Sequence, residues 1–293
     1  MEFSVEEKKQ YKSILLKTLK AFDSFCSEHS IKYYAAYGTA IGAIRHKGVI
    51  PWDDDIDVVM IREDYEKFLS LKSKLIGTAY RIIDPSDENY YLPYAKFTDT
   101  TTTLWEVEEY EFVIGVFIDI FPLDHETGSI ESIRKNSQKY RKICKRLYGG
   151  YENLTCNFSI SKFLCHPGLF VTWLKKLLFY RPLRRLNKRI FAKYNNKFKE
   201  KNCGEWLINY YAPYSVEREL LRSEWFETQL SVPFEDTSIN IMGEYHNYLT
   251  FLYGDYMTPP PLDLQNSHHF HYFYDLNQGI SIQEAKQIIQ TKV

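Results

Sequence analysis

The spacing of apolar residues predicts one long amphipathic helix at the start of the chain and a set of strands after it. Leu15, Leu19, Phe22 and Cys26 recur every three or four positions, which puts them on one face of a helix over residues 5–29. Short apolar runs then predict strands, over residues 31–37, 55–61, 79–83, 92–98 and 115–121. We expect the helix to pack across the sheet that these strands form.

Helical patterns return between and after the strands. A surface helix over residues 62–75 begins with acidic residues, which the positive end of the helix dipole favours. Residues 126–210 have a helical and basic pattern, and another helix is expected over 242–253. This mixed order predicts the α+β class: a mixed β-sheet core with flanking helices and a helical insertion, not a doubly wound sheet.

Three parts are expected along the chain. They are a catalytic core over residues 1–125, a basic helical region over 126–220, and a C-terminal segment over 221–293 that completes the active site. A chain of 293 residues can hold one large domain or a core with a second lobe. The formal net charge of -1 gives no indication of a nucleic-acid partner.

The five cysteines indicate a reducing compartment, because their number is odd and no two of them form a C-x-x-C pair. The N-terminal residues lack the apolar stretch of a signal peptide, and no window approaches the roughly 18 uncharged apolar residues of a spanning helix. We therefore expect a cytoplasmic protein, with any membrane contact peripheral and at the inner face of the plasma membrane.

Residues 175–201 mix many basic residues with aromatic and aliphatic ones. This composition is typical of a helix that lies on an anionic membrane surface. It is equally typical of a solvated helix pair packed on the core, and the sequence leaves both interpretations open.

Three aspartates stand in a row, Asp53, Asp54 and Asp55, and Asp57 follows at the start of an apolar run. Carboxylates this close repel one another, so a cation or a proton-transfer role is expected to offset the repulsion. The two-residue period of a strand points Asp55 and Asp57 to one side, where they can share Mg²⁺ or Mn²⁺. The alternative is a solvated turn with an aspartate as helix cap, which explains Asp57 poorly because it lies within the predicted strand.

Asp119 is the single charged residue of the apolar strand 115–121, and a buried carboxylate needs a cation or hydrogen-bond donors. We expect the cation of the aspartate cluster to meet this need, which makes Asp119 the third carboxylate of the site. Asp124 follows Phe-Pro-Leu and is expected in a turn or at a helix cap.

Gly38 and Thr39 lie between the predicted strand 31–37 and a short helical turn over residues 40–45. A glycine and a hydroxyl at such a junction let backbone N–H groups approach a phosphate. A Gly-Thr pair alone is a weak signal, but ahead of an Asp-x-Asp strand it resembles the pattern of the nucleotidyltransferase superfamily.

The stretch from Tyr37 to Leu69 closely resembles the LicD family of phosphocholine transferases and, more loosely, the fukutin-related glycan phosphotransferases. Its most distinctive parts are Arg45-His-Lys-Gly48, Ile50-Pro-Trp-Asp-Asp-Asp-Ile-Asp57 and Arg62-Glu-Asp-Tyr65. The resemblance continues over nearly the whole chain, with further matches at 95–97, 115–124 and 252–260. Residues 261–267 lack the charged run usual in the family, which bears on the substrate.

The resemblance implies the residues of the site. Asp55, Asp57 and Asp119 match the aspartates that hold Mg²⁺ or Mn²⁺, and either Asp53 or Asp119 is expected as the base. The predicted catalytic residues are therefore Asp53, Asp55, Asp57 and Asp119. Substrate contacts are expected from Gly38, Thr39, Arg45, His46, Lys47, Trp52, Lys96, His268 and His271.

The implied reaction moves phosphocholine or a polyol phosphate from a CDP-activated donor, first of all CDP-choline, and releases CMP. The expected acceptor is a sugar hydroxyl of a bacterial cell-surface glycan, a lipid-linked oligosaccharide or a teichoic acid. The 24 tyrosines offer aromatic faces of the kind that bind choline. Two alternatives remain open: a nucleotidyltransferase that releases pyrophosphate, and an inactive glycan-binding relative.

Overall fold

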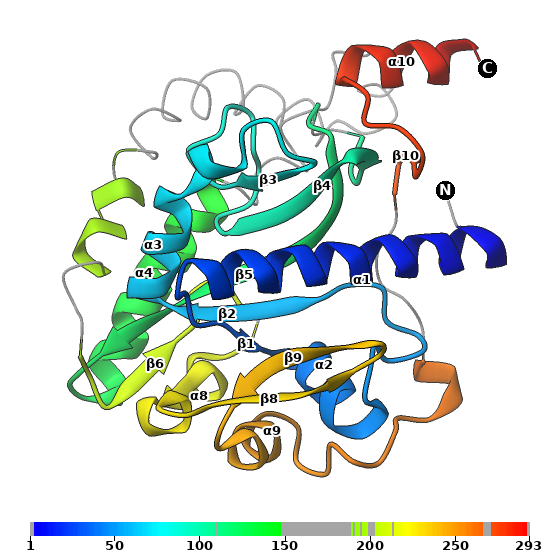
Figure 1. The fold of residues 1–293 in the computed structure, drawn as a ribbon. Helices are drawn as coiled ribbons and strands as arrows, with labels where there is room; N and C mark the ends of the chain where they lie inside the picture. The colour runs from blue at the N-terminus through cyan, green and yellow to red at the C-terminus, as the bar shows by residue number, and fades with distance from the viewer. Residues whose placement is uncertain are drawn as a thin grey trace, which may run out of the picture.

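The computed structural model describes residues 3–108, 111–147, 189, 191–193, 195–198, 203–212, 214–265 and 271–291. Its first helix, α1 (Val5–Glu28), lies across one face of a β-sheet (Figure 1). Ser4 and Glu7 form a capping box at the start of this helix, each side chain accepting the backbone N–H of the other residue. The predicted amphipathic helix is confirmed, since its buried side includes Leu15, Leu19, Phe22 and Cys26.

The sheet contains both parallel and antiparallel pairs. Its main path has the order β1 (Tyr34–Ala35), β2 (Asp57–Ile61), β5 (Ile114–Glu126), β4 (Ala95–Trp105) and β10 (Phe273–Asp275). β3 (Tyr80–Ile83) also pairs with β4, β6 (Trp206–Ile208) pairs with the end of β5, and β7 (Leu220–Arg222) pairs with β6. In the part of the chain that the structure describes, β2 and β5 are the parallel pair. The predicted α+β class with a mixed sheet is confirmed.

The remaining elements surround this sheet. Near the aspartates are the short helix α2 (Tyr37–Ile41), a π-helical turn (Gly42–His46), α3 (Arg62–Ser70) and a 3₁₀ turn (Lys72–Leu75). The later ones are α4 (Ile130–Leu147), α8 (Val216–Glu219), a 3₁₀ turn (Ser223–Phe226), the hairpin β8 (Gln229–Phe234) and β9 (Thr237–Met242), α9 (Tyr245–Tyr253), a 3₁₀ turn (Leu262–Leu264) and α10 (Ile282–Thr291).

Several predicted boundaries were wrong. The strand expected over 31–37 has two residues, because Tyr37 turns the chain with a φ of 48° and begins α2. Asp55 lies before β2, so the two-residue period does not relate it to Asp57. The region 126–210 is not uniformly helical, since it contains β6, and the basic segment 175–201 falls almost wholly outside the described residues. No described helix is long and apolar enough to cross a bilayer.

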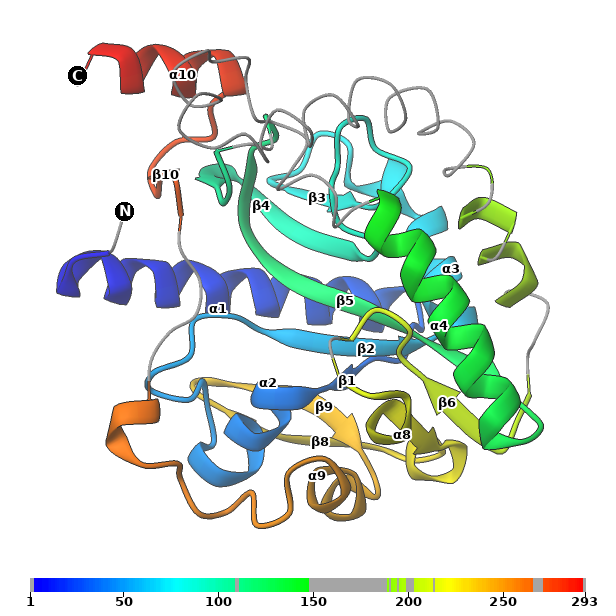
Figure 2. The same ribbon diagram turned by 180° about the vertical axis from the view of Figure 1, so that it is seen from behind.

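The two faces of the sheet have different roles. The ring of Phe97 in β4 faces α1, with centroids 5.6 Å from Phe22 and 6.2 Å from Phe25. Because side chains alternate along a strand, Lys96 points to the opposite face. Figure 2 shows this second face, with α4 and the chain between β6 and α8 lying over it.

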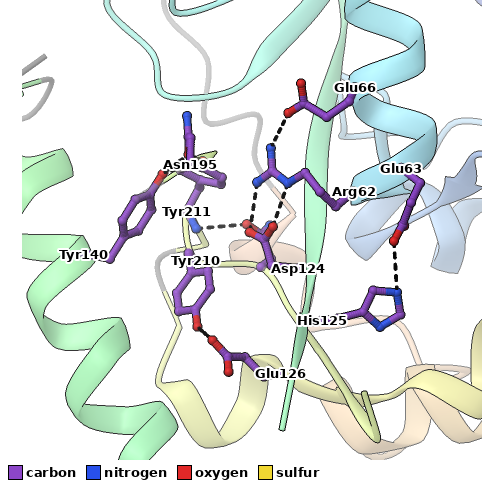
Figure 3. A network of polar contacts seen from close by, with 11 residues as sticks. Arg62, Glu63, Glu66, Asp124, His125, Glu126, Tyr140, Asn195, Tyr210 and Tyr211 are labelled. Atoms are coloured by element: carbon purple, nitrogen blue, oxygen red, sulfur yellow. Dashed lines mark hydrogen bonds and ion pairs between the residues drawn. The ribbon is translucent and has the colours of Figure 1, made fainter. Parts of the chain in front are cut away.

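Asp124 lies in β5, not in a turn or at a cap. It is fully buried and accepts two hydrogen bonds from the guanidinium of Arg62, at 2.6 and 2.9 Å (Figure 3). Arg62 also pairs with Glu66 at 3.1 Å. The sequence prediction missed this arrangement because the partner of Asp124 lies 62 residues away in the chain.

Candidate active site

Three charged side chains form a row across the second face of the sheet. The strand register places Asp57 of β2 beside Asp119 of β5, and Asp119 beside Lys96 of β4. The ammonium of Lys96 lies 2.8 Å from a carboxylate oxygen of Asp119 and 3.2 Å from the ring centroid of Phe117. The buried carboxylate of Asp119 therefore has a protein cation as its partner.

Burial changes the proton affinity of both aspartates. It raises the pKa of Asp57 well above its usual range, and the nearby charges of Asp55, Asp119 and Asp53 add to this increase. Burial also raises the pKa of Asp119 to about 6, against the opposing effect of Lys96. The row is thus electrostatically costly when both carboxylates are ionised.

Asp53, Asp54 and Asp55 form a half-buried cluster, with one carboxylate oxygen of each within 4.8 Å of the others. The backbone at Gly38 closely approaches this cluster, because a Cβ there would lie 2.7 Å from an oxygen of Asp53. All-oxygen donors at this density fit Mg²⁺ or Mn²⁺. The closely grouped carboxylates are those of residues 53–55. The sequence prediction instead named Asp55, Asp57 and Asp119 as metal ligands.

Gly38 and Thr39 lie in the first turn of α2, beside the aspartates. The hydroxyl of Thr39 is buried and accepts the N–H of Asp57 at 2.8 Å. This bond fixes the start of β2 against α2. Whether these two residues also contact a phosphate stays a prediction.

Arg45, His46 and Trp52 form a half-buried group, and Arg45 joins it to residues 256–258 of the C-terminal part of the chain. Arg45 donates to the carbonyl oxygens of Tyr256 at 2.7 Å and Thr258 at 3.4 Å, and its guanidinium lies 5.9 Å from the Trp52 ring. The ring of His46 is 5.7 Å from that of Trp52, and burial lowers the pKa of both His46 and Arg45.

Lys47 is exposed, and its contribution to the fold comes from its backbone. Its φ of 55° is in the left-handed region, and its carbonyl accepts the N–H of Glu235 at 2.7 Å. The side chain makes none of the ion pairs found among the described residues.

His271 is buried against the beginning of α1, with ring centroids 5.2 Å from Phe3 and 6.2 Å from Tyr11. Burial raises the pKa of Tyr11, and the charges of Asp54 and Asp55 add to the rise, so this end of α1 lies near the aspartate cluster. His268 lies outside the described residues.

Several residues of the site were missed by the sequence analysis. Glu106, after β4, accepts a very short hydrogen bond from Tyr91 and lies 3.8 Å from the ammonium of Lys96. Tyr94 packs on Phe121 with centroids 4.3 Å apart, and burial with the charges of Asp119 and Glu106 raises its pKa. The tyrosine-rich run at 90–94, which overlaps the start of the predicted strand 92–98, was the available signal.

Comparison with known proteins shows which family the chain resembles. The family described as "LicD/FKTN/FKRP, nucleotidyltransferase domain" matches residues 30–148, which hold all the described carboxylates of the row and cluster. The chain is 30% identical over 274 residues to the lipopolysaccharide cholinephosphotransferase LicD of Haemophilus influenzae, covering 90% of this chain and 96% of the relative.

Two shorter matches are uncharacterised rickettsial proteins. That of Rickettsia typhi is 34% identical over 80 residues, covering 27% of this chain and 25% of the relative. That of Rickettsia prowazekii is 40% identical over 50 residues, covering 17% and 19%. Because the match to the Haemophilus enzyme extends over almost the whole of both chains, this protein belongs to the LicD family of transferases.

Proposed function

We propose that this enzyme transfers phosphocholine from CDP-choline to a sugar hydroxyl of a cell-surface glycan, releasing CMP. The observation that carries the proposal is the row of Asp57, Asp119 and Lys96 beside the aspartate cluster 53–55. Support also comes from the near full-length similarity to a lipopolysaccharide cholinephosphotransferase.

Phosphoryl transfer depends mainly on positioning and on stabilising charge, and the site offers both. The acceptor oxygen attacks the distal phosphorus, the bond from that phosphorus to the bridging oxygen breaks, and the electron pair leaves with CMP. A carboxylate, Asp53 or Asp119, takes the proton of the acceptor hydroxyl. A divalent cation held by Asp55, Asp57 and Asp119, with Asp53 and Asp54 adjacent, would neutralise the diphosphate.

Lys96 has a different role in this scheme from the one expected from sequence. Its ammonium is buried and pairs with Asp119, so it fixes that carboxylate next to Asp57 and does not reach toward solvent. Arg45, bound to two carbonyl oxygens, orders residues 256–258 against the π-helical turn. Both are positioning residues in the proposed site.

For a lipid-linked acceptor, we also propose that the enzyme contacts the membrane that carries it. The basic residues of 175–201 would then bind anionic lipid peripherally. Absence of binding of the full-length protein to anionic vesicles at low salt would leave this segment as a solvated part of the fold.

The test is a donor screen. Purified enzyme with Mg²⁺ and a sugar acceptor is given CDP-choline, CDP-ribitol or CDP-glycerol, and CMP is measured. We expect release first from CDP-choline. Release from none of the three would overturn the proposal, and pyrophosphate release from CTP would instead indicate a nucleotidyltransferase.

A further inference from the structure

Arg141 of α4 and Arg218 and Glu219 of α8 contain buried polar atoms without a hydrogen-bond partner among the described residues. These atoms are Nε and Nη2 of Arg141, Nε of Arg218, and Oε1 of Glu219. We refer to these three residues as the Arg141–Glu219 cluster. Buried polar atoms are rarely left unpaired in native proteins, because each costs about 1–3 kcal/mol. So many in one place indicate a ligand that supplies the missing partners.

Other polar groups of the cluster and its neighbours have partners within the protein. The hydroxyl of Tyr37 donates to Oε2 of Glu219 at 3.1 Å and accepts from Asn209 at 2.8 Å. Nη1 of Arg141 donates to the carbonyl oxygen of Tyr214. The unpaired atoms are then one edge of the Arg141 guanidinium, Nε of Arg218, and one oxygen of Glu219, a side chain with no solvent exposure.

The cluster adjoins the catalytic row. Phe121 follows Asp119 by two residues on the same face of β5, a distance of about 7 Å along the strand. The ring of Phe121 lies 6.0 Å from that of Tyr37, which lies 6.4 Å from that of Tyr214. Aromatic rings thus connect the carboxylate row to the cluster, on the face that Figure 2 shows.

The chemistry of the unpaired atoms is specific. Nε and Nη2 of Arg141 are two parallel donors, and Oε1 of Glu219 is an acceptor. A cytosine base presents the complementary set, with acceptors at O2 and N3 and a donor at the N4 amine. Uracil presents an acceptor and an N–H donor where cytosine has the amine and N3. Bases bound in protein sites are read by such hydrogen bonds and by stacking on aromatic rings.

We propose that the Arg141–Glu219 cluster, with the rings of Tyr37 and Tyr214, binds the cytosine base of the nucleotide donor. This inference rests on the proposed function, since it assigns the base of the donor whose diphosphate would lie at the carboxylates. Burial raises the pKa of Glu219 to about 7, and a hydrogen bond from the N4 amine would stabilise its ionised form.

The test compares the binding of CMP and UMP to the full-length enzyme by titration calorimetry with Mg²⁺. The wild type should prefer CMP at least tenfold, because a site built to pair with one base leaves polar atoms unpaired with the other. Glu219→Gln should bring the two affinities together, since an amide can also donate to O4 of uracil. Arg141→Lys should weaken CMP at least tenfold while keeping a positive charge.

The matched control is Arg134→Gln with Glu217→Gln. Arg134 and Glu217 form an exposed pair between the same two helices, α4 and α8, so this variant should keep the CMP preference. Thermal unfolding verifies that each variant is folded. An unchanged CMP to UMP ratio in Glu219→Gln and in Arg141→Lys would overturn the inference, as would the lack of any preference in the wild type.

An error in the base assignment and an error in the proposed reaction would give different experimental results. If the wild type releases CMP from CDP-choline but neither variant changes the CMP preference, only the base assignment is wrong. If the variants lose the preference while no donor is turned over, the base site stands and the proposed reaction is wrong.

Discussion

Asp57 and Asp119 are neighbours on adjacent strands but differ in their partners. Asp119 pairs with the buried ammonium of Lys96, whereas Asp57 takes part in none of the ion pairs among the described residues. The neighbours that act most strongly on Asp57 are other aspartates. A single amide substitution should therefore have opposite effects on stability at the two positions.

Asp57→Asn should abolish CMP release and raise the melting temperature of the metal-free protein at neutral pH. An acid whose pKa is raised by folding lowers stability once it is ionised, and the amide removes that charge. Thermal unfolding in EDTA and a CMP assay with Mg²⁺ measure the two effects.

The matched variant Asp119→Asn should lose activity and also unfold more easily, because the buried Lys96 ammonium loses its carboxylate partner at 2.8 Å and keeps only Glu106 at 3.8 Å. Wild-type turnover in the Asp57 variant would contradict the assignment of this residue to the active site.

Glu219 should make the stability of the protein depend on pH. Its pKa rises from 4.5 to about 7 on folding, so the folded state holds the proton more tightly than the unfolded state. The free energy of unfolding should then decrease between about pH 4.5 and pH 7, by up to about 3 kcal/mol. Arg141, Arg218 and the Tyr37 hydroxyl oppose the shift and limit its size.

Urea unfolding at pH 5 and pH 8 measures this effect. The Glu219→Gln variant should not show this decrease in the free energy of unfolding. All other titrating groups contribute equally to the variant and the wild type. The same pH dependence in the variant and the wild type would show that Glu219 titrates normally.

At the scale of elements, the shared register of β2 and β5 ends next to a buried ion pair. Asp57 pairs in register with Asp119 at one end, and Ile61 with Leu123 at the other. Arg62 and Asp124 follow directly and form the buried bidentate pair. This pair fixes the alignment of the two strands and so the relative position of the Asp57 and Asp119 carboxylates.

Asp124→Asn should lower the free energy of unfolding by about 3 kcal/mol, since the buried Arg62 guanidinium loses its bidentate carboxylate and keeps only the pair with Glu66 at 3.1 Å. The control is Arg81→Gln, which breaks an exposed pair with Asp87 and should cost less than about 1 kcal/mol. The measurement is the urea concentration at the midpoint of unfolding of each variant. Equal losses would mean that the buried pair has no special role in the alignment.

The elements that the sequence predicted well are those with a strong local period. Residues 5–29 and 115–121 carry repeated apolar positions, and both elements formed. The two-residue strand β1 and the position of Asp124 were missed, because a left-handed turn at Tyr37 and a partner distant in sequence determine them. Local periodicity contains no information on either.

The residues of the candidate site also differ in whether the sequence alone could predict them. Asp57 and Asp119 were predicted as site residues because charged residues in apolar strands stand out, and Lys96 was predicted from the family resemblance. Their pairing, with Lys96 on Asp119, depends on strand register and was not predictable from residue types. Glu106 follows β4, Arg141 lies in α4 and Glu219 lies in α8, and only the fold brings them to this face.

At the scale of the whole molecule, ligand binding should be visible as stabilisation of the native state. CDP-choline should raise the melting temperature with Mg²⁺ present and much less in EDTA, because the carboxylates of the site repel a diphosphate without a cation. Differential scanning fluorimetry with and without EDTA is the measurement. An equal shift in both conditions would argue against metal binding by the aspartates.

β5 is hydrogen-bonded to β2, to β4 and to β6, whereas residues 51–56 belong to no strand or helix. In hydrogen–deuterium exchange, the amides of β5 should open only with global unfolding, and those of 51–56 through local fluctuations of much lower free energy. Asp119 is then a fixed point of the site, while Asp53 to Asp55 can adjust their positions to whatever binds. The change in protection on binding should therefore concentrate in 51–56 and leave β5 as it was.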